Sequence, residues 1–172
     1  MRAIPLTVTA LAVTLALTAC DGGGSDGGKS KSGSGCAVGK ASVQAGSASV
    51  APAAGDTGQV VVSITNQSAP CTLDGFPHVE VNRSGVTATL KPQKGAKAQK
   101  LKLAKGDSAT FTVTYVRGAD GDAKSLKATS MNVTLPGSDV AQDIPWKYGP
   151  IAGTTGQGDP NAFVSAFQQA GD

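Results

Sequence analysis

The chain has 172 residues, and 15 basic residues against 12 acidic ones give it a formal net charge of +3. One histidine in the whole chain excludes a histidine-based metal cluster. Aromatic residues make up only 4% of the sequence, and none is interleaved with the basic residues, which argues against stacking on nucleic-acid bases.

The N-terminus has the pattern of a secretory signal peptide over residues 1–19. A positive start at Arg2 precedes an uncharged apolar run over residues 3–16, which is shorter than the about 20 residues a membrane-spanning helix needs. The run Leu17-Thr18-Ala19-Cys20 resembles the lipobox of bacterial lipoproteins, in which the signal is cut before the cysteine and its sulfur is acylated, for example with palmitate. We therefore expect a protein lipid-anchored to the extracytoplasmic face of the cell membrane.

An ordinary signal peptide, leaving a soluble secreted protein with a free Cys20, is the alternative. The cysteine count favours the anchor, because one of three cysteines is left over when the other two pair in an exported chain. Acylation of Cys20 accounts for the odd one. Cys36 and Cys71 then remain available for a disulfide in an oxidising compartment.

Residues 20–35 comprise the acylated cysteine and a Gly/Ser-rich segment with no apolar side chain after Cys20. Such a composition predicts a disordered tether with a root-mean-square reach on the order of 20 Å. This is enough to hold a domain just off a membrane surface. The glycines lack the Gly-Lys-Ser/Thr frame of a phosphate-binding loop.

Residues 36–172 predict one all-β domain, because apolar residues recur with a period of two and turn residues separate the runs. Seven or eight short strands at this spacing are typical of an antiparallel sandwich or a barrel. The alternating positions are Val60/Val62/Ile64, Val79/Val81, Val86/Ala88/Leu90, Leu101/Leu103, Phe111/Val113/Tyr115 and Met131/Val133/Leu135.

Residues 71–78 predict a turn-rich hinge between two strands. Pro70 and Pro77 keep the residues before them extended, and the Asp-Gly pair at 74–75 can take a positive φ. Cys71 and Phe76 are expected to attach this hinge to the core.

Two hairpins are predicted from the turn residues. One joins residues 79–82 to 86–90 around Arg83-Ser84-Gly85, and the other joins residues 108–116 to 126–135.

The C-terminal segment 159–170 fits either a short helix after Asp159-Pro160 or a final strand with Phe163, Ser165 and Phe167 on one face. We favour the strand, because a sandwich needs its edge closed. Trp146 and Tyr148 are expected to cover the core at a strand end.

The run from Asn66 to Pro77, Asn-Gln-Ser-Ala-Pro-Cys-Thr-Leu-Asp-Gly-Phe-Pro, lies between a strand and a Val-Glu-Val segment. Together with Cys36 it resembles the DUF4232 family, domains of unknown function in lipoproteins and secreted proteins of high-GC Gram-positive bacteria. The resemblance covers about residues 36–170. It implies an immunoglobulin-like antiparallel β-sandwich, a Cys36–Cys71 disulfide and a cell-surface location, but no activity. His78 departs from the family pattern, which more often has a small residue there.

Few residues are candidates for chemistry. His78 and Glu80 lie two apart on a predicted strand and share a face, so they could form a weak two-ligand metal site, whereas a surface pair is the simpler interpretation. Serines are plentiful, but no Gly-x-Ser-x-Gly elbow occurs. The Asn-x-Ser/Thr triplets at Asn66, Asn82 and Asn132 are interpreted as incidental in a bacterial chain.

A lysine-rich stretch between residues 91 and 105, with no acidic residue among them, is the one asymmetry of charge. It could contact anionic envelope material, such as phospholipid headgroups or a phosphate-bearing wall polymer. Alternatively, its lysines could protect an edge strand from pairing with another sheet. We call these six residues the lysine segment: Lys91, Lys94, Lys97, Lys100, Lys102 and Lys105.

The sequence therefore predicts a lipid-anchored, non-catalytic binding or structural module without a cofactor. Its expected partners are the membrane, through the lipid anchor, and an envelope polymer or an envelope protein; nucleic acid is not expected. The alternative is an envelope metal carrier that uses His78 and Glu80.

Overall fold

The computed structural model describes residues 34–170, and every regular element in that range is a β-strand. No helix in the described range is long and apolar enough to cross a membrane. The predicted signal peptide, Cys20 and all but the last two residues of the predicted tether lie outside the described residues.

The larger sheet has six strands, and its centre is the antiparallel pair formed by β2 and β8. Its neighbouring strands are antiparallel, except that β6 and β11 run parallel. The sheet order is β1 (Ala41–Ser49), β2 (Thr57–Asn66), β8 (Ser108–Val116), β11 (Ala162–Val164) and β6 (Lys91–Pro92), with β12 (Gln168–Gln169) also paired to β8.

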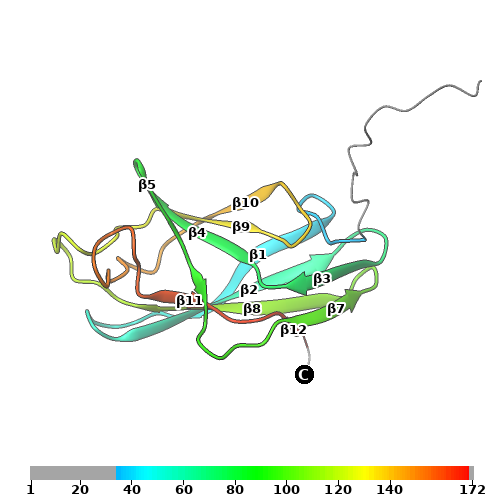
Figure 1. Cartoon of the computed structure of the whole chain (residues 1–172), viewed down its shortest axis with the longest axis horizontal. Coiled ribbons are helices and arrows are strands. Elements are labelled where there is room, and N and C mark those ends of the chain that lie inside the picture. Colours follow the sequence, from blue (N-terminus) through cyan, green and yellow to red (C-terminus); the bar gives the residue numbers. More distant parts are fainter. Residues whose placement is uncertain (1–33, 171–172) are drawn as a thin grey trace, which may run out of the picture. The chain divides into compact units, whose positions relative to one another are not determined.

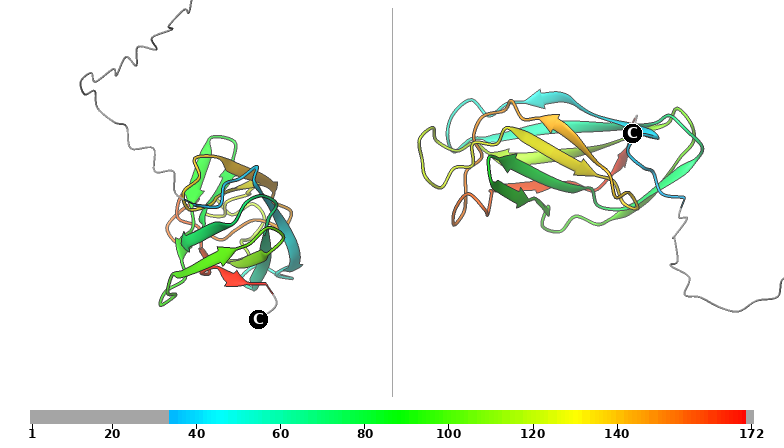
Figure 2. Two further views of the ribbon diagram at one scale, coloured as in Figure 1. Left: turned by 90° about the vertical axis from the view of Figure 1, so that its right-hand side faces the viewer. Right: turned by 90° about the horizontal axis from the view of Figure 1, so that it is seen from above.

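A four-stranded antiparallel sheet forms the second layer, and a two-stranded sheet lies at one end of the domain (Figure 1). Seen from above, β9 and β10 lie side by side with β4 next to β9 (Figure 2). The second layer has the order β10 (Ala141–Pro145), β9 (Ser130–Thr134), β4 (His78–Arg83) and β5 (Val86–Thr89), and the small sheet pairs β3 (Cys71–Gly75) with β7 (Gln99–Leu103).

The core consists of the inward-facing residues of these sheets, which form a single apolar cluster. Alternate residues of β2, β4, β8 and β9 are fully buried, as expected for a sandwich in which each sheet has one face on the core and one face in solvent. The predicted all-β sandwich is therefore confirmed, whereas the immunoglobulin-like arrangement stays a prediction. The buried alternating positions are Val60, Val62, Ile64, Val79, Val81, Phe111, Val113, Tyr115, Met131 and Val133.

The first predicted hairpin is present, and the second is not. β4 and β5 pair around Gly85, whose φ of 78° suits a tight turn. β8 and β9 instead belong to different sheets. The connection over residues 117–129 is long enough to cross between the layers, and Leu126 is held within it by backbone hydrogen bonds to Ile151.

Residues 71–75 form the strand β3 and are not a turn. Gly75 does have a positive φ of 110°, but it ends a strand that pairs along its length with β7. Cys71 attaches this segment to the core as predicted, since it packs against the core and is bonded to the buried Cys36. Leu73, which is fully buried, is a second attachment, whereas Phe76 is only half-buried. The prolines kept the segment extended, and the distant partner β7 made it a strand.

The C-terminal segment is extended, as favoured, but its two phenylalanines face opposite ways. Phe163 is 36% exposed and Phe167 is fully buried against Phe111, with 5.9 Å between their ring centroids. From Val164 to Gln168 the chain advances four residues while β8 advances three, from Val113 to Thr110. This extra residue reverses the facing of the segment, as a β-bulge does.

Trp146 covers the core where β10 ends, as expected. Its ring packs edge-on against Tyr115 and Tyr148, with centroid distances of 5.1 and 4.9 Å. Its indole N–H donates to the carbonyl of Gly149 at 2.7 Å, so the polar edge of the ring is satisfied.

We expect Phe167→Ala to lower the free energy of unfolding by about 3–5 kcal/mol, because it removes a fully buried ring and leaves a cavity. Phe163→Ala removes the same atoms from an exposed position and should cost much less. Chemical denaturation of both variants measures the difference. Equal losses would contradict the reversed facing.

Candidate functional site

The end of the domain at which the chain enters is held together by a covalent and a backbone link to β3. Cys36 and Cys71 lie at disulfide distance, with 4.9 Å between their Cα atoms. The Thr72 N–H donates to the carbonyl of Ser34 at 2.7 Å, and the Cys36 N–H donates to the carbonyl of Thr72 at 3.1 Å. We call this region, residues 34–36 with β3 and β7, the entry end.

Asn66 joins the entry end to the turn after β7. Its side-chain amide donates to the carbonyls of Ala69, Leu103 and Ala104 at 2.9–3.1 Å, and its oxygen accepts from the Ser68 N–H at 3.1 Å. The residue is 1% exposed, and it is one of two buried polar residues in the range 34–170. A buried amide with four partners fixes the backbone around it.

The sequence itself carries a signal for this role of Asn66. Val60, Val62 and Ile64 face inward, and the same period of two places Asn66 on the inward face of β2. An amide at an inward position predicts a buried hydrogen-bonding centre. Asn66, the first residue of one of the Asn-x-Ser/Thr triplets, therefore has a structural role that does not depend on glycosylation.

All six side chains of the lysine segment are exposed. Lys91 forms an ion pair with Asp159 at 3.4 Å, and Lys100 pairs with Asp74 at 3.1 Å. The other four, Lys94, Lys97, Lys102 and Lys105, form no ion pair within residues 34–170. Residues 99–103 make up β7, whose backbone pairs with β3 on one side alone.

This arrangement agrees in part with each interpretation of the lysine segment. Lys91 lies on β6, the last strand of the larger sheet, and Lys100 and Lys102 lie on β7, so lysines do occupy edge strands. Lys94 and Lys97 lie in the loop between these strands, and Lys105 lies in the turn that follows β7, where no strand edge needs protection.

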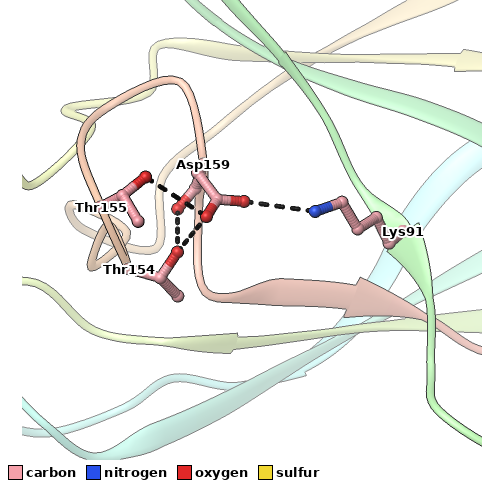
Figure 3. A network of polar contacts seen from close by, with 4 residues as sticks. All are labelled: Lys91, Thr154, Thr155 and Asp159. Carbon is pink, nitrogen blue, oxygen red and sulfur yellow. Dashed lines mark hydrogen bonds and ion pairs between the residues drawn. The ribbon is translucent and has the colours of Figure 1, made fainter.

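Lys91 belongs to a polar network with the loop before β11 (Figure 3). Asp159 accepts from the hydroxyl of Thr154, from the Lys91 ammonium at 3.4 Å and from the hydroxyl of Thr155 at 3.4 Å. The hydrogen bond from Thr154, with the hydrogen bond and charge of Lys91, lowers the pKa of Asp159 below its ordinary value. The carboxylate is therefore ionised at neutral pH.

The comparisons with known proteins identify the domain but not its activity. The family model described as a domain of unknown function, DUF4232, matches residues 36–168. The chain belongs to the DUF4232 family. No curated protein and no solved structure matches it. The matched range of the DUF4232 domain contains both paired cysteines, Asn66 and the whole lysine segment.

The predicted metal pair of the DUF4232 domain lacks a third ligand. His78 Nε2 and Glu80 Oε1 are 3.6 Å apart on the outer face of β4, and the His78 side chain is 56% exposed. No group of three histidine, cysteine, aspartate or glutamate residues able to hold a metal ion occurs in the described part of the chain. A surface pair on a strand, the simpler interpretation, describes these two residues.

We expect Asn66→Ala to lower the free energy of unfolding of the DUF4232 domain by about 1–3 kcal/mol, because it leaves buried backbone groups without partners. Asn82→Ala is the matched control, since its half-buried side chain makes no hydrogen bond within residues 34–170. Urea denaturation compares the two. A loss at Asn82 as large as that at Asn66 would refute the special role of Asn66.

We expect Asp159→Asn to destabilise the domain slightly at neutral pH, because it removes the charge that Lys91 and Thr154 stabilise. The pKa of Asp159 is lower in the folded state, so its stabilisation is present above the ordinary value of 3.8 and is lost as the pH falls through the lowered pKa. Unfolding measured between pH 7 and strongly acidic pH should show the variant and the parent converging. Asp139→Asn, which removes an exposed carboxylate without an ion pair in the described range, is the control. A difference that persists unchanged into acid would disprove this account.

Proposed function

We propose that this protein is a lipid-anchored, non-catalytic module of the extracytoplasmic envelope, and that the unpaired lysines of the lysine segment contact the anionic phosphates of the surface to which it is tethered. The observation that supports this most is the position of β7. Thr72 of β3 is hydrogen-bonded to Ser34 and stands opposite Lys102 of β7 in the pairing register. Lys102 is therefore one strand from the point at which the chain enters the domain.

Lys102 lies a short distance from the point at which the chain enters the domain. Neighbouring strands lie about 4.8 Å apart, so Lys102 begins within roughly two strand spacings of the entering chain. A tether of the predicted composition reaches on the order of 20 Å. An anchor at Cys20 would keep the entry end closer to the membrane than the loop between β8 and β9, which lies at the opposite end of the domain (Figure 1).

The binding free energy that these lysines can supply suits orientation of the domain on the surface better than its attachment to the surface. Each lysine close to an anionic membrane contributes about 1 kcal/mol at most, and the contribution decays within a Debye length. Lys94, Lys97, Lys102 and Lys105 together would add a few kcal/mol. We infer that the lipid supplies the attachment, while the lysines select which end of the sandwich faces the surface.

A binding experiment tests the lysines separately from the anchor. The chain from residue 20 onward, carrying Cys20→Ser, is mixed with vesicles of phosphatidylcholine alone or with added phosphatidylglycerol, at about 0.1 M and about 1 M salt, where the Debye length is about 10 and about 3 Å. We expect binding to the anionic vesicles alone, and only at the lower salt concentration. Isolated cell-wall polymer, tested in parallel, identifies a polymer as the source of the phosphate.

Matched charge reversals locate the contact. Lys94, Lys97 and Lys102 are changed together to glutamate in one variant, and three exposed lysines elsewhere, Lys124, Lys127 and Lys147, are changed in the other. Both variants have the same net charge, so only a localised contact distinguishes them. Binding lost in the first and kept in the second supports the proposal. Equal losses in the two variants, or binding that salt does not affect, would refute it.

A further inference from the structure

A small hollow lies where β5 passes into β6, against β11 and the loop that precedes it. Its volume is about 160 Å³, and its wall includes Thr89, Lys91, Thr154, Asp159 and Phe163. Pockets for drug-sized ligands have volumes of about 300–1,000 Å³, so this hollow suits one ring of a longer ligand.

Phe163 gives the hollow an apolar wall. It is the one aromatic residue among the exposed large hydrophobic residues of the described range; the other two are Val50 and Val140. Phe163 stands next to Lys91 in the parallel register of β11 and β6. An exposed ring beside a polar wall combines the apolar surface and the few placed polar groups that small-ligand sites use.

The polar groups of the hollow are held in place by hydrogen bonds, and the charges of Lys91 and Asp159 nearly cancel. The Asp159 carboxylate is shared by Thr154, Thr155 and Lys91 (Figure 3). Lys91 has three N–H donors, of which Asp159 uses one, so donors remain for a ligand. Because the ammonium is already paired with a carboxylate, a neutral ligand rich in hydroxyl groups fits better than a phosphate.

A row of polar side chains continues from the hollow across the outer face of the four-stranded sheet. Thr89 stands opposite Glu80, Glu80 opposite Asn132, and Asn132 opposite Asp143, on four successive strands. Directly opposite residues share a face and have Cβ atoms about 5 Å apart. The side chains of Thr89, Asn132 and Asp143 make no hydrogen bond to the protein within residues 34–170, so their donors and acceptors face solvent.

We propose that the hollow and this row form a binding site for a neutral oligosaccharide. One sugar ring would lie with its C–H face on Phe163 and its hydroxyls toward Lys91 and Thr154. The following rings would run over Glu80 and Asn132, whose side chains offer both donors and acceptors to hydroxyl groups. The site is separate from the unpaired lysines, and its ligand carries no charge, so it goes beyond the proposed contact with an anionic surface.

Titration with defined oligosaccharides tests this site. The chain from residue 20 onward, carrying Cys20→Ser, is titrated with cellotetraose, maltotetraose and the tetramer of N-acetylglucosamine, and amide chemical shifts are followed by NMR. We expect at least one of them to shift the amides of residues 89–91 and 154–163, with an affinity that salt does not change. If none of the three shifts these amides, the proposal is wrong. Vesicle binding is measured on the same sample, so failure of one proposal is distinguishable from failure of the other.

Two pairs of variants make the test specific. Phe163→Ala should weaken binding at least tenfold, and Val140→Ala, which also shortens an exposed apolar side chain, should not change it. Asn132→Ala should weaken binding of the tetramer but not of the corresponding monosaccharide, titrated in the same way, because only the longer ligand reaches β9. Full binding by Phe163→Ala, or an equal effect of Val140→Ala, would overturn the proposal.

Discussion

The pairing of β2 with β8 is the constraint on which the rest of the domain depends. The two strands run antiparallel from Thr57 opposite Val116 to Thr65 opposite Ser108, and their inward side chains form the centre of the core. β1 pairs with the free side of β2, and β11 and β12 pair with the free side of β8. The entry end and the polar hollow both adjoin this pair. Asn66 ends β2 at the entry end. β11 pairs with β8 and places Phe163 beside the polar hollow.

Much of the fold could be predicted from the sequence because β-branched and aromatic residues alternate where a sheet buries one face. β2, β4, β8 and β9 follow this rule and are present. β1 consists mostly of alanine, serine and glycine, whose low strand preference hides it, and it is a strand because β2 offers an edge. The facing of Phe167 depends on one extra residue relative to β8, which no pattern within its own segment reveals.

The candidate sites show the same division between local and distant information. The exposure of the lysines could be predicted from their spacing, because Lys100 and Lys102 alternate with Leu101 and Leu103. The ion-pair partners of these lysines could not be predicted from the spacing. Asp159 is 68 positions from Lys91, and only the pairing of β6 with β11 brings the two together. The polar row over Glu80 and Asn132 likewise depends on the pairing of strands distant in sequence.

The link between Cys36 and Cys71 also determines how the domain responds to mechanical load. β1 is an edge strand, and the chain reaches it directly from Cys36, so tension on the preceding residues would otherwise peel β1 from β2 one hydrogen bond at a time. The disulfide passes part of that tension to β3, which is paired along its whole length with β7. It also closes a loop whose restriction stabilises the fold by about 3–4 kcal/mol in the chain-entropy model. The edge strand nearest the point of pulling is therefore the one that the cross-link protects from unzipping.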